Sequence, residues 1–448
     1  MTRELILGIL LEVTRGEEYS HIALRNVLNK YQYLDKKERA FITRVTEGTL
    51  EHMIEIDYII NQYSQVKVNK MKPVIRCIIR SAVYQLKYMD SVPDSAVCNE
   101  AVKLAAKKGF YTLKGFVNGV LRNIARNIDN ITYPDKNDYV NYLSVRYSMP
   151  TWILEQWLCY YEKETVETML EDFLKEKPTT IRCNLNCMSQ EELNASLEKE
   201  GVTVGKHPYL PYALCISSYD YLADLDSFQK GGFHVQDISS MLVAHLANPK
   251  AGDLVVDVCA APGGKALHVA ELLQGSGRVE ARDLTDYKVQ LIEDNISRSG
   301  MSNIEAVKWD ATVLDENMVG QKDVVIADLP CSGLGVLGKK TDLKYKMTKE
   351  MQADLVFLQR QILSTVQAYV KEDGTLVYST CTIHEEENMG NVRWFLEQYP
   401  EFKLDCIEDL LCDELKGSVK EKGCLQLLPG IHESDGFFIA KFKRVKHE

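Results

Sequence analysis

The spacing of hydrophobic residues changes twice along the chain and divides it into three parts. From residue 1 to about 130, apolar residues recur every three or four positions, as at Ile75, Ile79, Val83 and Leu86, and this spacing predicts an all-helical bundle. From residue 253 onward, short β-rich runs alternate with longer amphipathic stretches such as DYKVQLIEDNISRSG. The alternation predicts a doubly wound, mostly parallel sheet of the Rossmann-like kind. Its predicted strands are DLVVDVC, GRVEARD, NIEAVKWD, KDVVIADLP and GTLVYSTC.

The stretch between these two patterns is mixed. Residues 131 to about 155 are rich in prolines and aromatics, which predicts a connection. TTIRCNLN then reads as a strand, and SQEELNASLEKEG as a helix that ends at Gly201. We therefore expect a multidomain α and α/β protein with a helical domain at 1–130, a linker and small α+β module at 131–240, and a Rossmann-like domain at 241–448. Near the carboxyl end, CLQLLPGIHESDGFFIAKFKR predicts two antiparallel strands at one edge of the sheet.

Composition narrows the class of protein. The chain is 45% apolar and 26% charged, as expected of a globular protein. Its 12 cysteines lie at irregular spacings without a paired CxxC framework, so we expect reduced thiols and no metal site. No apolar run reaches the length of a membrane span, and Glu12 and Arg15 interrupt the apolar run at the amino terminus. We expect a soluble cytoplasmic protein without a membrane partner, with a monomer as the default state.

Charge is unevenly distributed. The net charge is -11, yet residues 1–130 hold 20 basic against 14 acidic residues. A polyanionic partner should therefore meet the amino-terminal part first. In this part Lys114, Asn118, Arg122 and Arg126 fall four apart and predict a polar stripe on one helix face. The stripe is a candidate phosphate-binding surface, and an ordinary solvated face is the alternative.

Candidate cofactor residues follow the predicted strands. Gly263 and Gly264 come after the first strand and allow a ligand to approach the next helix start. Asp283 ends the second strand about 20 residues later, where an acid can bind ribose hydroxyls. Asp310 follows the third strand and could bind an adenine edge, although either acid could instead serve a turn or helix cap. Since neither GxGxxG nor GxxxxGK[ST] occurs, S-adenosylmethionine is favoured over NAD and ATP.

Two cysteines also follow strands. The fourth strand ends in DLPCSGLG and the fifth ends at Cys381. Methyltransferases that act on amino nitrogens have a Pro-Pro-aromatic motif at the end of the fourth strand, whereas this chain has Pro330-Cys331. A thiolate that adds to carbon 6 of a pyrimidine activates carbon 5 for methylation, and Asp328 is suited to assist at N3. The chemistry alone leaves open which thiol is the nucleophile and which the assistant. A buried packing role is the alternative for a single strand-end cysteine.

These motifs carry a family resemblance. DVCAAPGGK, DLPCSGLG, YSTCTIHEEEN and LPGIHESDGFF resemble the RNA cytosine-5 methyltransferases, and FHVQDISSMLV looks like the segment before their cofactor domain. Residues 93–124 look like the helical NusB-type RNA-binding domain. The fusion is similar to the RsmB (Sun/Fmu) branch, whose members methylate a cytosine in 16S ribosomal RNA. The resemblance covers nearly the whole chain.

The resemblance implies specific roles. It makes Cys381 the nucleophile and Cys331 the residue that assists release, with Asp328 and Lys265 beside them. It implies an enzyme of the 16S rRNA (cytosine(967)-C(5))-methyltransferase type, with S-adenosylmethionine as cofactor and 16S rRNA or an early assembly intermediate as partner. The cofactor-binding residues it implies are Cys259, Ala260, Ala261, Pro262, Gly263, Gly264, Lys265, Asp283, Asp310 and Asp328.

Two departures and two alternatives accompany this interpretation. Thr382 stands where serine is commoner, and TDLKY replaces a more usual Pro-Asp-Ile-Lys-Trp around Tyr345. One alternative is a cytosine-5 methyltransferase that acts on another RNA, such as tRNA. The other is a non-catalytic RNA-binding or antitermination factor, which the presence of Asp328, Cys331 and Cys381 disfavours.

Overall fold

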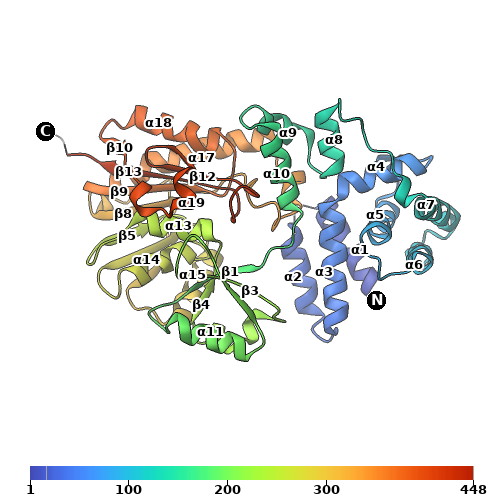
Figure 1. The fold of residues 1–448 in the computed structure, drawn as a ribbon, viewed down its shortest axis with the longest axis horizontal. Helices are drawn as coiled ribbons and strands as arrows, with labels where there is room; N and C mark the ends of the chain where they lie inside the picture. The colour runs from blue at the N-terminus through green and yellow to red at the C-terminus, as the bar shows by residue number, and fades with distance from the viewer. Residues whose placement is uncertain (17, 447–448) are drawn as a thin grey trace. The chain divides into compact units, whose positions relative to one another are not determined.

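The computed structural model describes residues 1–16 and 18–446, and the chain forms two compact units. The helical unit comprises Met1–Leu174 together with Leu337–Lys346, and the α/β unit comprises Lys175–Val336 together with Met347–Glu448. Figure 1 labels the elements of both. Within the described residues no helix is long and apolar enough to cross a membrane.

The helical unit begins with the predicted bundle. Ile75, Ile79 and Val83 lie on one face of a helix and are fully buried in the core, as their spacing predicts. The bundle consists of α1 (Thr2–Arg15), α2 (Ser20–Lys30), α3 (Lys36–Glu51), α4 (Met53–Tyr63), α5 (Pro73–Tyr88), α6 (Asp94–Lys107) and α7 (Lys114–Arg126). The prediction of an all-helical amino-terminal part is confirmed.

Three more helices follow where the sequence predicts a connection. They are α8 (Tyr139–Arg146), α9 (Thr151–Leu158) and α10 (Lys163–Phe173). Pro150 occupies the N-cap position of α9, outside the hydrogen-bonded turns, where a proline does not interrupt a helix. The prediction of a connection from the prolines is therefore wrong for most of residues 139–155.

A segment from much later in the sequence completes the helical unit. This returning segment, Leu337–Lys346, contains the short helix α16 (Leu343–Lys346). The backbone amide of Ser20 donates to Asp342 Oδ2 at 2.9 Å, and its hydroxyl donates to Oδ1 at 2.6 Å. The Lys344 ammonium donates to the carbonyl oxygen of Glu51 at 2.9 Å. These buried contacts fix the segment on the bundle.

The α/β unit opens with a small α+β module, as predicted. Its antiparallel sheet has the order β2-β3-β1-β4, with β1 (Thr179–Cys183), β2 (Thr203–Lys206), β3 (Ala213–Ser217) and β4 (Phe233–Val235). Helix α11 (Gln190–Lys199) begins with a capping box between Ser189 and Glu192. The short helix α12 (Asp226–Gln229) precedes β4.

The larger sheet has the order β11-β12-β13-β9-β8-β5-β6-β7. Strands β5 (Leu254–Asp257), β6 (Arg278–Asp283), β7 (Ile304–Lys308), β8 (Lys322–Asp328) and β9 (Val370–Thr380) are parallel. The antiparallel side consists of β10 (Phe402–Leu404), β11 (Val419–Glu421), β12 (Cys424–Leu427) and β13 (Phe437–Arg444). Strand order reverses between β5 and β8, and such a switch point is where open α/β sheets bind ligands. The predicted mostly parallel sheet with an antiparallel edge is confirmed.

Helices cover both faces of this sheet. On one face pack α17 (Lys349–Val366) and α18 (Asn391–Gln398), and on the other α13 (Ile238–Ala247), α14 (Gly264–Leu272) and α15 (Asp286–Ser299) (Figure 1). Neighbouring residues of one strand enter different cores, since Val255 packs with α13 and α14 whereas Val256 packs with α17. Burial on both faces explains why β5, β8 and β9 contain continuous apolar runs in the sequence, whereas β6 and β7 on the outer side of the sheet are interrupted by charged residues. The last helix is the short α19 (Asp413–Lys416).

Candidate active site

The glycine-rich loop connects β5 to α14. Gly263 has φ +104°, and a Cβ at this position would lie 3.4 Å from the Ile292 side chain. The positive φ therefore favours glycine where the chain turns into α14. Asp283, at the end of β6, holds the loop, since its Oδ2 accepts from the Ala261 amide at 3.0 Å. Its Oδ1 lies 3.0 Å from Lys288 Nζ.

Asp257 lies beneath this loop and is a site residue that the sequence analysis missed. Its side chain is completely buried, and within the described structure its Oδ2 has no hydrogen-bond partner. Burial, followed by the charge of Asp328, raises the pKa of Asp257 to about 7. An acceptor left without a donor fits a cofactor that supplies N–H or O–H groups. The available signal was an acid at the end of a buried apolar strand.

Two further predicted residues form an ion pair. Lys265 Nζ, in the first turn of α14, lies 2.7 Å from Asp328 Oδ2 at the end of β8. The Ser379 hydroxyl donates to Asp328 Oδ1 at 2.7 Å. Burial lowers the pKa of Lys265, but the charge and hydrogen bond of Asp328, together with the charges of Asp257 and Cys381, outweigh this effect and leave the pKa raised. Lys265 thus keeps its charge at the edge of the sheet.

The two candidate thiols meet at the same edge. Asp328 and Ser379 are in register on the parallel strands β8 and β9, so the residues that follow them come together. Cys331 Sγ lies 3.3 Å from Cys381 Sγ. Hydrogen bonding to Cys381 and burial hold the pKa of the Cys331 thiol well above its ordinary value. The thiol form of Cys331 is therefore favoured over its thiolate.

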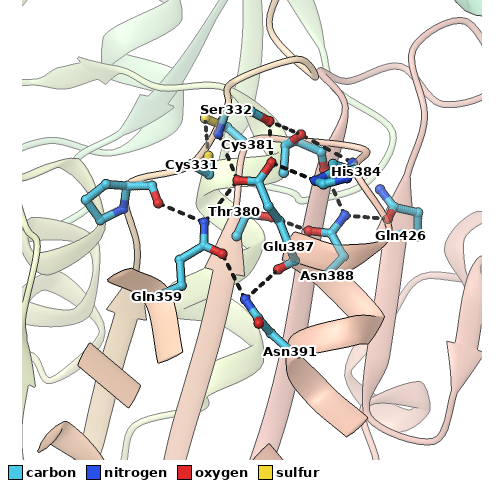
Figure 2. A network of polar contacts seen from close by, with 12 residues as sticks. Cys331, Ser332, Gln359, Thr380, Cys381, His384, Glu387, Asn388, Asn391 and Gln426 are labelled. Carbon is cyan, nitrogen blue, oxygen red and sulfur yellow. Dashed lines mark hydrogen bonds and ion pairs between the residues drawn. The ribbon is translucent and has the colours of Figure 1, made fainter. Parts of the chain in front are cut away.

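A buried polar network supports the two thiols. Figure 2 shows Cys331 and Cys381 side by side, with Glu387 and Asn388 beneath them and Gln359 at one side. All three of these polar side chains are buried. Gln359 is a second residue that the sequence analysis missed, although it occupies a position of α17 that packs into the molecule, where an apolar residue is normally expected.

The remaining predicted cofactor residues are more peripheral. Cys259 is partly buried, and burial raises the pKa of its thiol. Asp310 is exposed, and its Oδ1 accepts from the amide and hydroxyl of Thr312 at 2.9 Å and 2.7 Å. This geometry is that of a turn-forming aspartate. Binding of an adenine edge by Asp310 stays a prediction.

The predicted polar stripe lies on α7 in the helical unit. Arg122 and Arg126 are exposed, and Arg122 Nε donates to Asn118 Oδ1 at 2.9 Å. Lys114 Nζ lies 4.4 Å from the ring centroid of Tyr111, whose side chain is 70% exposed. An exposed aromatic ring beside basic groups is suited to single-stranded nucleic acid. Tyr345, whose surroundings depart from the family pattern, belongs to the returning segment, and its hydroxyl lies 3.3 Å from the Ser148 carbonyl oxygen.

A mostly parallel sheet with a glycine turn and strand-end acids at its switch point defines a Rossmann-like S-adenosylmethionine-dependent methyltransferase. Comparison with known families narrows this class. Residues 244–443 match the family described as 16S rRNA methyltransferase RsmB/F, and residues 149–220 match the ferredoxin-like domain of RsmF/B-like methyltransferases. Residues 1–126 match the NusB family.

Individual relatives agree over nearly the full length. Probable ribosomal RNA small subunit methyltransferase B of Bacillus subtilis (strain 168) is 34% identical, over 99% of this chain and 98% of the relative. Its counterpart of the same name in Synechocystis sp. (strain ATCC 27184 / PCC 6803 / Kazusa) is 32% identical, over 99% of each chain. The chain belongs to the RsmB/F family of 16S rRNA methyltransferases, and its cofactor is S-adenosylmethionine.

Solved structures show the same fold. The crystal structure of PH0851 is 25% identical, with a TM-score of 0.82 over 98% of both chains. NSun6 from Pyrococcus horikoshii with SFG is 25% identical, with a TM-score of 0.58 over 65% of this chain and 97% of that one.

Proposed function

We propose that this chain methylates carbon 5 of a cytosine in 16S rRNA through a covalent adduct between Cys381 and carbon 6. The observation that carries the proposal is the pair of thiols 3.3 Å apart, beside the ion pair of Lys265 and Asp328. The family and the named relatives support small-subunit rRNA as the substrate class. The residue roles are those that the motifs imply.

Different side chains at this edge of the sheet serve the successive steps of the reaction. The thiolate of Cys381 adds to carbon 6 while Asp328, in its protonated form, gives its proton to N3 as negative charge develops on the ring, and the resulting carboxylate pairs with Lys265. Carbon 5 then carries the electron pair that takes the methyl group, which S-adenosylmethionine supplies from its sulfonium. A base must next remove the carbon-5 proton, and the Cys381 sulfur leaves carbon 6 as a thiolate. We assign assistance with this breakdown to Cys331.

The protonation of the thiols supports this order of roles. The raised pKa of Cys331 favours its thiol form, in which it can donate a hydrogen bond to the departing sulfur of Cys381.

A denaturing-gel assay for covalent RNA tests the proposal. A small-subunit rRNA fragment and S-adenosylmethionine are mixed with wild type, Cys331→Ala or Cys381→Ala. We expect a stable adduct in Cys331→Ala, because breakdown is blocked, and none in Cys381→Ala. Cys187→Ser is the matched control, because Cys187 is exposed and remote in sequence from both motifs. Bisulfite sequencing of the product identifies the methylated cytosine, which we propose is C967.

The opposite pattern, with an adduct only in Cys381→Ala, exchanges the roles of the two thiols. Transfer of methyl groups to tRNA but not to the rRNA fragment contradicts the proposed substrate. Absence of both adduct and methyl transfer contradicts the proposed function as a whole.

A further inference from the structure

We infer that two consecutive residues hold the two thiols separately, Glu387 acting on Cys331 and Asn388 on Cys381. Both residues lie in the π-helical turn η7 (Glu386–Gly390), which follows β9. The inference rests on the proposed function for its chemistry. Its geometric basis is the buried network of Figure 2.

Glu387 holds the residues on both sides of Cys331. Its Oε2 accepts from the Ser332 amide at 2.8 Å, and its Oε1 accepts from the Ser332 hydroxyl. Gln359 links the same carboxylate to the preceding residue, because its Nε2 donates to the Pro330 carbonyl at 2.8 Å and to Glu387 Oε2 at 3.0 Å. The backbone on either side of Cys331 is therefore tied to one carboxylate.

The carboxylate itself is fixed. Glu387 is fully buried, and His384 Nδ1 lies 3.2 Å from its Oε1. Asn391 orients Gln359, since its Nδ2 donates to Gln359 Oε1 at 2.8 Å. A carboxylate surrounded by donors at this depth is held in one position, because leaving it unpaired is costly.

Asn388 holds the residues on both sides of Cys381 by hydrogen bonds. Its Oδ1 accepts from the Thr380 hydroxyl at 2.6 Å, and its Nδ2 donates to the Thr382 carbonyl at 3.0 Å. The same Nδ2 donates to Gln426 Oε1 on β12 at 3.0 Å. The residues before and after Cys381 are therefore both tied to one amide.

The two sets of contacts meet where the Ser332 and Thr382 hydroxyls lie 2.8 Å apart. A second link runs through His384, which contacts Glu387 Oε1 and whose amide donates to the Thr382 hydroxyl at 3.3 Å. The remaining contacts of the carboxylate hold the Cys331 loop, and those of the amide hold the Cys381 loop. Because Cys381 forms the adduct and Cys331 assists its breakdown, Glu387 serves breakdown and Asn388 serves formation. Both are positioning residues, since they act through the thiols.

Isosteric exchanges provide a matched test. Glu387→Gln replaces an acceptor of the Ser332 donors with an amide, and Asn388→Asp removes both amide donations. We expect Glu387→Gln to form the RNA adduct and to accumulate it, as Cys331→Ala does. Asn388→Asp should slow adduct formation by about 10²-fold, because misplacing a reacting group by an ångström costs about that factor.

Double variants separate positioning from a general loss of structure. Adding Glu387→Gln to Cys331→Ala should leave the amount and lifetime of the adduct unchanged, because the thiol that Glu387 positions is already gone. Adding Asn388→Asp should slow adduct formation in that background too. A marked loss of adduct in the first double variant overturns the assignment of Glu387.

A measurement without RNA tests the geometry alone. Labelling by iodoacetamide, mapped by mass spectrometry, should rise several-fold at Cys331 in Glu387→Gln and at Cys381 in Asn388→Asp. Glu386→Gln is the matched control, since the same exchange one residue earlier alters an exposed side chain. Calorimetric binding of S-adenosylmethionine verifies that each variant keeps its cofactor site.

These readouts separate the two proposals. If wild type and Cys331→Ala give neither adduct nor methyl transfer while labelling follows the expected pattern, the proposed function fails and the positioning stands. Equal changes in labelling at both thiols in each variant overturn the separate roles of Glu387 and Asn388.

Discussion

Asp257 is the residue whose environment departs furthest from that of an ordinary acid. It lies between the strand ends that carry Asp283 and Asp328, whose charges raise its pKa, while the charge of Lys265 lowers that pKa. Ionisation there is opposed first by burial and then by the neighbouring acid. The Asp257 carboxyl beside the cofactor loop consequently exchanges its proton near neutral pH.

We expect Asp257→Asn to remove part of the pH dependence of stability. The pKa of this carboxyl is 3.8 in the unfolded chain and about 7 in the folded one. The protonated carboxyl therefore adds to the stability of the wild type at low pH, and this contribution falls as pH rises through the window and is gone above pH 7. The difference amounts to at most about 4 kcal/mol. Urea unfolding of cofactor-free protein at pH 5 and pH 8 measures it.

The free energy of unfolding of Asp257→Asn, taken relative to that of the wild type, should therefore be larger at pH 8 than at pH 5. Asp413→Asn is the matched control, because Asp413 is exposed and lies far along the chain. An unchanged difference between wild type and Asp257→Asn at both pH values contradicts the expectation.

At the scale of elements, helix α7 is the predicted contact for RNA. Its basic side chains are exposed on one face, while Val117, Val120 and Ile124 are buried on the other. Such an arrangement leaves the guanidinium groups free to neutralise phosphates.

Arg126→Gln should therefore weaken binding of an rRNA fragment and reduce the slope of log affinity against log salt by about 1. Fluorescence anisotropy between low and moderate salt measures both quantities. Lys416→Gln, a substitution of an exposed lysine on α19, is the control. An unaltered slope in Arg126→Gln excludes a phosphate contact at this position.

Elements with a strong local signal were predictable. Strands β5, β8 and β9 appear as short apolar runs because both faces of the sheet are covered, and the capping box of α11 marks its start. The strand-end positions of Cys331 and Cys381 followed from the same runs. Sequence order alone could not give their separation of 3.3 Å.

Residues with distant partners were not predictable. Gln359 is satisfied by Pro330 and Glu387, which lie on other elements, so its sequence neighbours carry no trace of the contact. Its one local signal is that Ile362, Leu363 and Val366 of the same helix are buried with it. The prolines led to the wrong prediction of a connection, because Pro150 precedes a helix and does not interrupt one.

At the scale of the whole molecule, the two units are interleaved in sequence. The chain leaves the α/β unit after Val336, contributes the returning segment to the helical unit, and re-enters at Met347. Cys331 lies only a few residues before this departure. The loop that carries Cys331 is thus continuous with a segment anchored on the helical bundle by Asp342.

Lys344 makes the anchoring sensitive to pH. Burial lowers the pKa of its ammonium to about 8 from the ordinary 10.5. The cost of burying the charge is fully present below pH 8 and disappears as pH rises toward 10.5, so the wild type should gain stability in that window, by up to about 3 kcal/mol.

Lys344→Met should lack this gain, and melting temperatures at pH 7.5 and pH 10 measure it. Lys349→Met serves as the control because Lys349 is exposed. A parallel rise of wild type and Lys344→Met would show that the buried ammonium does not titrate in this range.

The returning segment also sets an order of events during synthesis. A ribosome adding about 5–20 residues per second releases the first ten helices well before the segment that completes their unit, a delay on the order of ten seconds or more. Until then the amide and hydroxyl of Ser20 lack Asp342 as their acceptor. The helical unit therefore reaches its final form only after the strand that leads to Cys331 has been made, so an intact helical unit implies a chain already extended past Cys331.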